Sequence, residues 1–162
     1  MSDTDVDPHI LGPGLLPTPF SAEEIRAGCR EGRFIRLLVE VDGREPFHRT
    51  NRFVDVDAEG ATLESQQLTL EGRPISEIEA KRTTWHQLQA HAAFDASSTT
   101  RSTETIETPL GVDECIRYEQ VEGGEISTFW FALSSPGMPI RYETREGGHV
   151  TSRVTMIENV RA

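Results

Sequence analysis

The sequence predicts an α+β domain that is mostly antiparallel β, built as a curved sheet or half-barrel of about eight strands. Three observations predict this class. Short segments with apolar residues at alternate positions recur along the chain. Turn signals such as Asp42-Gly43 and Gly147-Gly148 separate those segments. Two helix-start signals, at Ser21 and Thr84, predict an N-terminal helix and a second helix packed on the concave face of the sheet.

The chain of 162 residues has the length of one domain. Residues 1–19 form a Pro/Gly-rich tail, because their prolines and glycines disfavour regular structure, and residues 20–162 form a single β-rich domain. The leucines of the tail favour a strap across the body, and a mobile tail is the alternative, above all for the acidic first seven residues.

The first helix is expected between Phe20 and Gly32. Ser21 is the predicted N-cap, and Glu24 follows three residues later, where it completes a capping box. Gly32 is the predicted left-handed residue that ends the helix.

Strands are expected to follow this helix. Apolar residues alternate with polar ones over residues 35–41, and a return strand covers residues 47–57. Further along, the apolar positions switch from odd to even numbers, which predicts a β-bulge near Gln66-Gln67.

The second helix is expected at about residues 84–94, with Thr84 and Gln87 forming another capping box. Residues 98–108 are rich in threonine and polar on both faces, which is typical of an edge strand or of a strand facing a wet interior. The run Phe129-Trp130-Phe131 is apolar on both faces and predicts a central strand in a closing meander.

Composition excludes some functions. The net charge of −11 repels phosphate backbones, so nucleic acid is not an expected partner. No segment approaches the roughly 20 apolar residues of a membrane helix. Met1 to Asp7 lacks a basic leader, so a cytoplasmic location is expected, with Cys29 and Cys115 as buried thiols; one disulfide between them stays open.

No motif predicts a catalytic residue, a metal site or a cofactor. His86 and His91 are five residues apart, so they would not share a helix face as a metal pair does. Asp55 and Asp57 could share a proton or hold a cation, or could simply face solvent. An enzyme that uses these groups is therefore the third hypothesis.

One stretch carries a family resemblance. Residues 105–145 hold Thr108-Pro-Leu-Gly, Cys115, Tyr118, Phe129-Trp-Phe-Ala and Pro136-Gly-Met-Pro-Ile-Arg. This stretch resembles uncharacterised bacterial half-barrel domains related to the lipoprotein-carrier superfamily of the outer-membrane localisation system. The resemblance implies a half-open barrel with helices at its mouth and a cavity for acyl chains.

The first functional hypothesis is therefore a non-enzymatic protein that binds an apolar or amphipathic small molecule. Five residues are the candidate ligand-binding positions: Trp85, Leu88, Tyr118, Trp130 and Met138. The alternative is a protein-interaction or scaffold domain, for which a homodimer formed through a strand edge is one arrangement.

A basic patch near the start of the second strand gives two further interpretations. It consists of Arg44, His48, Arg49 and Arg52. These residues either bind an anionic head group or carboxylate, or pair with the neighbouring glutamates of a hairpin loop.

Overall fold

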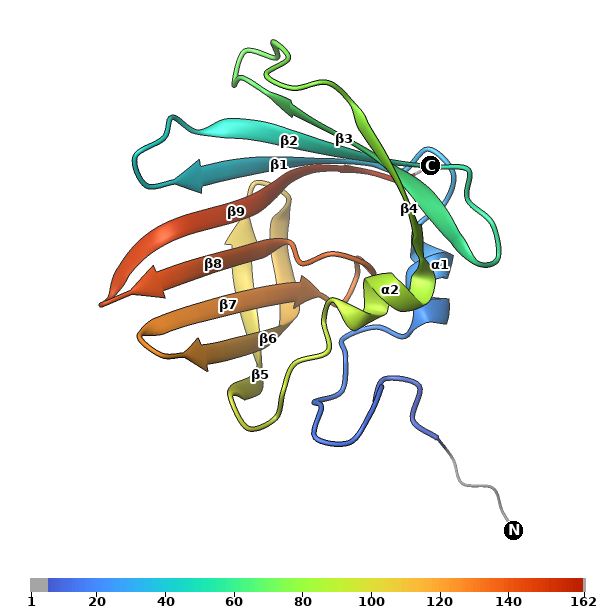
Figure 1. Cartoon of the computed structure of the whole chain (residues 1–162), viewed down its shortest axis with the longest axis vertical. Helices are drawn as coiled ribbons and strands as arrows, with labels where there is room; N and C mark the ends of the chain where they lie inside the picture. Colours follow the sequence, from blue (N-terminus) through green and yellow to red (C-terminus); the bar gives the residue numbers. More distant parts are fainter. Residues whose placement is uncertain (1–5, 162) are drawn as a thin grey trace.

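The computed structural model describes residues 6–161, which form one open antiparallel sheet of nine strands and two helices (Figure 1). The order across the sheet is β4-β3-β2-β1-β9-β8-β7-β6-β5. The first and last strands of the chain pair with each other in the middle, while β4 and β5 form the two edges. The strands are β1 Phe34–Val41, β2 Phe47–Val54, β3 Gly60–Leu68, β4 Glu79–Thr84, β5 Thr99–Thr108, β6 Gly111–Glu122, β7 Glu125–Ala132, β8 Arg141–Glu146 and β9 His149–Val160.

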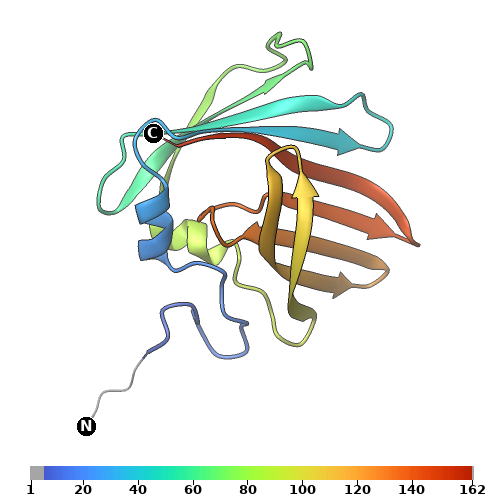
Figure 2. The same cartoon turned by 180° about the vertical axis from the view of Figure 1, so that it is seen from behind.

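The predicted antiparallel class is confirmed, but the sheet has one strand more than expected. The additional strand is β4, whose sequence Glu79–Thr84 is polar and shows no alternation of apolar residues. Most of its side chains are exposed, and it forms only because its backbone pairs with β3. The β5–β6 hairpin forms the opposite edge of the sheet. In the view from behind, β5 also comes close to β9 (Figure 2).

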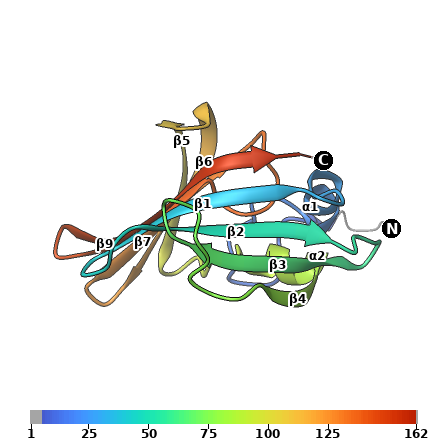
Figure 3. The same cartoon turned by 90° about the horizontal axis from the view of Figure 1, so that it is seen from above.

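Both predicted capping boxes are present, and both helices are shorter than expected. Helix α1 spans Ala22–Gly28 with Ser21 as N-cap, and α2 spans Trp85–Ala90 with Thr84 as N-cap. After Cys29 the chain leaves the helix because the Gly32 amide bonds to the Phe53 carbonyl at the end of β2. The two helices contact each other at one end of strands β1 to β4 (Figure 3).

The predicted bulge near Gln66-Gln67 is wrong. Strand β3 pairs with β2 in one unbroken register through both residues. The change in apolar parity reflects the end of the strand, because Leu70 lies beyond it and is 49% exposed. The register shifts that do occur involve β9, at Arg36/Leu37 of β1 and at Thr144/Arg145 of β8.

The N-terminal segment is bonded to the body of the domain. The Leu16 amide donates to the Phe94 carbonyl, and the Tyr118 hydroxyl donates to the Pro17 carbonyl at 2.6 Å. The buried Gln89 side chain donates to the Pro8 carbonyl and to the Thr18 hydroxyl. These bonds match the expected strap from residue 8 onwards; residues 1–5 of the tail lie outside the described part of the chain.

A continuous apolar strip runs across the concave face of the sheet. Alternation along β1 turns Ile35, Leu37 and Val39 to this face, and all three are buried. In register beside them on β9 lie the buried Met156 and Val154. This strip is the floor on which the candidate site is built.

The opposite face carries a buried carboxylate, Glu143, between Arg145 and Arg153 at 3.0 and 2.7 Å. Burial by itself would raise its pKa, but hydrogen bonds and charge from the two arginines outweigh burial, and the net pKa is lowered. A carboxylate with a lowered pKa stabilises the folded state at pH values above its unfolded-state pKa of about 4.3. This contribution is lost as the pH falls through the folded-state pKa.

We therefore expect Glu143→Gln to lower the free energy of unfolding at pH 7 by about 1 kcal/mol, a modest value because both arginines are partly exposed. The difference from the wild type should narrow towards pH 3. Urea unfolding at both pH values measures it, and a difference independent of pH would contradict the assignment.

Candidate functional site

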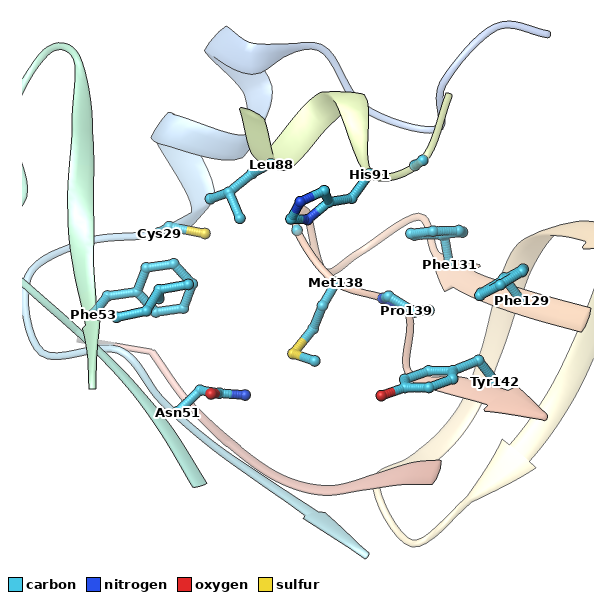
Figure 4. Close-up of a pocket in the computed structure, with 13 residues that line it drawn as sticks. Cys29, Asn51, Phe53, Leu88, His91, Phe129, Phe131, Met138, Pro139 and Tyr142 are labelled. Atoms are coloured by element: carbon cyan, nitrogen blue, oxygen red, sulfur yellow. The ribbon is translucent and has the colours of Figure 1, made fainter. Parts of the chain in front are cut away.

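A cavity of about 340 Å³ lies between α2 and the concave face of the sheet (Figure 4). Its walls come from both halves of the chain, and most of them are apolar. The lining residues are Cys29, Asn51, Phe53, Leu63, Leu88, His91, Ala92, Phe129, Phe131, Gly137, Met138, Pro139 and Tyr142.

Strand alternation explains how the sheet supplies this lining. Asn51 and Phe53 are two residues apart on β2 and so face the same side. Phe129 and Phe131 do the same on β7, and Tyr142 of β8 is paired directly with Phe129. The rings of Phe129 and Tyr142 stack with their centroids 6.0 Å apart.

A buried arginine holds the loop that closes one wall. Arg33 is 1% exposed, and its Nη1 donates to the Pro136 carbonyl at 2.7 Å and to Cys29 Sγ at 3.0 Å. Its Nη2 donates to the Ser135 hydroxyl at 3.0 Å. The loop from Gly137 to Pro139 follows directly and places the Met138 side chain in the cavity.

Few of the residues that line the cavity have titratable side chains. It includes no carboxylate, and its titratable side chains are those of Cys29, His91 and Tyr142. Burial raises the pKa of the Cys29 thiol, and the nearby Arg33 charge opposes this rise only in part. A protonated thiol is a poor nucleophile.

Two of the five predicted ligand-binding residues line the cavity, namely Leu88 and Met138. Trp130 points to the other face of β7, where its Nε1 donates to Glu104 at 2.7 Å. Tyr118 lies on the concave face but is covered by Phe94 and by the Pro17 carbonyl. Trp85 is buried and donates to the Asp57 carbonyl. A binding role stays a prediction for Leu88 and Met138.

Sequence reasoning did not select the other lining residues. Some of them carry a usable signal, since Phe129 shares its face of β7 with Phe131, and Tyr142 follows Met138 and Ile140 at alternate positions. Asn51 carries none, because it is polar and only the tertiary structure brings β2 against α2.

The remaining chemical candidates have structural roles. Asp57 accepts hydrogen bonds from the Glu59 and Gly60 amides, which lower the pKa of its carboxyl group. Asp55 follows the end of β2 and has a positive φ of 52°.

Among residues 6–161, no three His, Cys, Asp or Glu side chains are grouped so that they could hold a metal ion. Within the same range, no helix is long and apolar enough to cross a membrane.

The cavity has one polar edge. The Tyr142 hydroxyl accepts a hydrogen bond from Arg49 Nη2 at 2.8 Å, and Asn51 Oδ1 accepts one from the Ser65 hydroxyl at 2.7 Å. Arg49 lies two residues before Asn51 on the same face of β2. The other members of the predicted basic patch lie apart from it: Arg44 stacks on Phe47, and Arg52 stacks on Phe34.

Comparisons with known proteins identify the fold. No protein-family model and no curated protein matches the chain. A putative exported protein with a YmcC-like fold from Bacteroides fragilis is similar with a TM-score of 0.50 and 11% identity, over 82% of this chain and 97% of that one. MucB is similar with a TM-score of 0.56 and 10% identity, over 85% of this chain. The match covers 56% of MucB, so this chain spans little more than half of that protein.

A third similar structure is a putative outer-membrane lipoprotein-sorting protein domain from Vibrio parahaemolyticus, with a TM-score of 0.30 and 8% identity over 86% of this chain and 90% of that one. At these identities likeness establishes the fold alone. The predicted resemblance is therefore confirmed as a likeness of fold, that of an open antiparallel half-barrel.

The predicted cytoplasmic location is wrong. One structural neighbour is described as a putative exported protein, and this finding contradicts the prediction. The prediction relied in part on two unpaired cysteines, and these do not report the compartment. Cys29 and Cys115 are both free thiols and both fully buried, so the fold shields them from oxidants in any compartment.

Proposed function

We propose that this protein binds an apolar or amphipathic small molecule, without catalysis, in the cavity between α2 and the sheet. The observation that carries the proposal is the cavity itself, at about 340 Å³ within the usual size range of small-molecule sites. Several large apolar side chains around it are only half-buried, which leaves apolar surface for a ligand to cover. They are Leu63, Leu88, Phe129 and Met138.

In this proposal the two helices form the cover of the concave face. Leu88 and Ala92 lie on the ligand side, and His91 lies at the exposed rim. Helix α2 has only six residues, and its position depends on Thr84 at the end of β4.

The first test is native mass spectrometry of the purified protein, followed by solvent extraction. A discrete mass above 18.1 kDa that disappears on extraction would support a bound ligand. Failure of both this test and the titration described next would count against the proposal.

Filling the cavity should weaken binding. We expect Ala92→Leu to reduce the affinity for the neutral fluorescent probe N-phenyl-1-naphthylamine by about tenfold, because the added atoms take up ligand space in a wall that is already packed. Fluorescence titration measures the affinity.

The matched control is Ala90→Leu, which makes the same chemical change at an exposed position of α2. Its affinity should stay within twofold of the wild type. Equal affinities for the two variants would place the probe outside this cavity.

The alternative function, a protein-interaction domain, is favoured by one observation. Strand β5 is a ten-residue edge strand whose side chains are mostly exposed, so one row of its backbone groups is available for pairing. A homodimer through this edge would have twice the mass of 18.1 kDa in native mass spectrometry.

A further inference from the structure

We infer that the ligand carries a carboxylate, and that Arg49, Asn51 and Tyr142 bind this group at the polar edge of the cavity. The inference rests on the proposed function, since it concerns the head group of the same ligand. Among residues 6–161, one arginine at this edge has no carboxylate partner, and two nearby hydrogen-bond donors have no acceptor.

The charge belongs to Arg49. Its side chain reaches from β2 across β1 and β9 to Tyr142 on β8, a path that the curvature of the sheet makes possible. In residues 6–161, no carboxylate oxygen lies within 4.0 Å of its guanidinium group. Other arginines of the sheet are paired, for example Arg36 with Glu158 at 3.0 Å.

This lack of a partner is unusual for the composition of the chain. Acidic residues outnumber basic ones by 27 to 16, so carboxylates are plentiful. Arg49 is nevertheless half-buried on the concave face, and the cavity beside it has no carboxylate in its lining. A half-buried cation next to an apolar cavity gains most from an anion that arrives with the ligand.

The two donors belong to Tyr142, which contacts Arg49, and to Asn51, which lies two residues from Arg49 on the same face of β2. The Tyr142 oxygen accepts from Arg49, so its own hydrogen is available to another acceptor. The Asn51 oxygen accepts from Ser65, so its amide NH₂ group is available as well. Neither donor has an acceptor in the part of the chain that the structure describes. Figure 4 shows the Asn51 amide nitrogen and the Tyr142 hydroxyl facing each other across the cavity beside Met138.

These groups together select an anion. A guanidinium, an amide NH₂ group and a hydroxyl hydrogen all donate, and a carboxylate is acceptor-only. The apolar walls formed by Phe53, Leu88 and Phe129 extend from this polar edge, so a ligand with a chain and a carboxylate would satisfy both parts of the site. The exposed ring of His91 lies with α2, on the helix side of the cavity.

The test compares two probes that share one chain, dodecanoate and dodecanol, at pH 8 and below their aggregation concentrations. Isothermal titration calorimetry of the full chain should show dodecanoate binding at least tenfold more tightly than dodecanol. Arg49→Gln should reduce dodecanoate affinity by about tenfold or more and change dodecanol affinity by less than threefold.

The matched control is Arg52→Gln, which removes the same charge from the opposite, exposed face of the same strand and should leave both affinities within twofold. Tyr142→Phe provides a second variant that keeps the ring stacked on Phe129 and removes only the hydroxyl. It should weaken dodecanoate binding about threefold or more.

The outcomes separate the two proposals. Equal binding of dodecanoate and dodecanol by the wild type would overturn the carboxylate assignment and leave the apolar site standing. No binding of either probe up to its solubility limit, with no co-purified ligand, would overturn the proposed function itself. Selectivity for dodecanoate that survives both Arg49→Gln and Tyr142→Phe would show that the anion binds elsewhere.

Discussion

Gly60→Ala is expected to lower the free energy of unfolding by about 3 kcal/mol, because the new methyl group has no space. An ideal Cβ at Gly60 would lie 2.0 Å from the Thr83 carbonyl oxygen and 2.8 Å from the Thr84 Cα. Both are backbone atoms of β4, so no side-chain rotation can relieve the overlap. Urea unfolding followed by tryptophan fluorescence measures the loss.

The substitution should affect the cavity as well as stability. Gly60 is paired with Thr84, which is the N-cap of α2, and α2 carries Leu88 into the cavity wall. We therefore expect the affinity for N-phenyl-1-naphthylamine to fall with stability. The control is Gly124→Ala, where no atom lies within 4 Å of the added methyl and φ is not positive. That variant should stay within about 1 kcal/mol of the wild type, and equal losses at both sites would refute the steric argument.

Arg33→Met is expected to lower the free energy of unfolding by about 3 to 5 kcal/mol. Methionine occupies a similar volume but donates no hydrogen bond. The Pro136 carbonyl and the Cys29 sulfur would lose the Arg33 donor. The Ser135 hydroxyl would keep only its hydrogen bond from the Asn159 amide. The same change would release the loop that places Met138 in the cavity.

Arg30→Met is the matched control, because Arg30 is exposed and belongs to the same connection between α1 and β1. Its free energy of unfolding should change by about 0.5 kcal/mol or less. A loss below about 1 kcal/mol for Arg33→Met would mean that the loop acceptors find other donors, and that Arg33 does not hold the cavity wall.

The helix starts and the strands with alternating residues could be predicted because their causes are local. The Ser21–Glu24 and Thr84–Gln87 capping boxes join residues three apart, and each forms as predicted. The threonine-rich segment of residues 98–108 became an edge strand, as its polarity on both faces predicts. The likeness to half-barrel domains was also correctly identified from residues 105–145.

The end of the first helix and the fourth strand depended on contacts between distant segments. Helix α1 ends before Gly32 because the Gly32 amide finds its acceptor at Phe53, more than twenty residues further along the chain. Strand β4 has no apolar alternation, and its pairing partner β3 defines it. No local pattern contains either fact.

The candidate site likewise depends partly on local sequence patterns and partly on contacts between distant segments. The sequence determined that Leu88 lies one helical turn after the start of α2 and that Phe129 and Phe131 share a strand face, because helix and strand periodicities are fixed by backbone geometry. Only the tertiary structure decided that Arg49 contacts Tyr142 and that Asn51 and Tyr142 line the same cavity. This arrangement depends on the β1–β9 pairing and on the curvature of the sheet, which bring together segments some ninety residues apart.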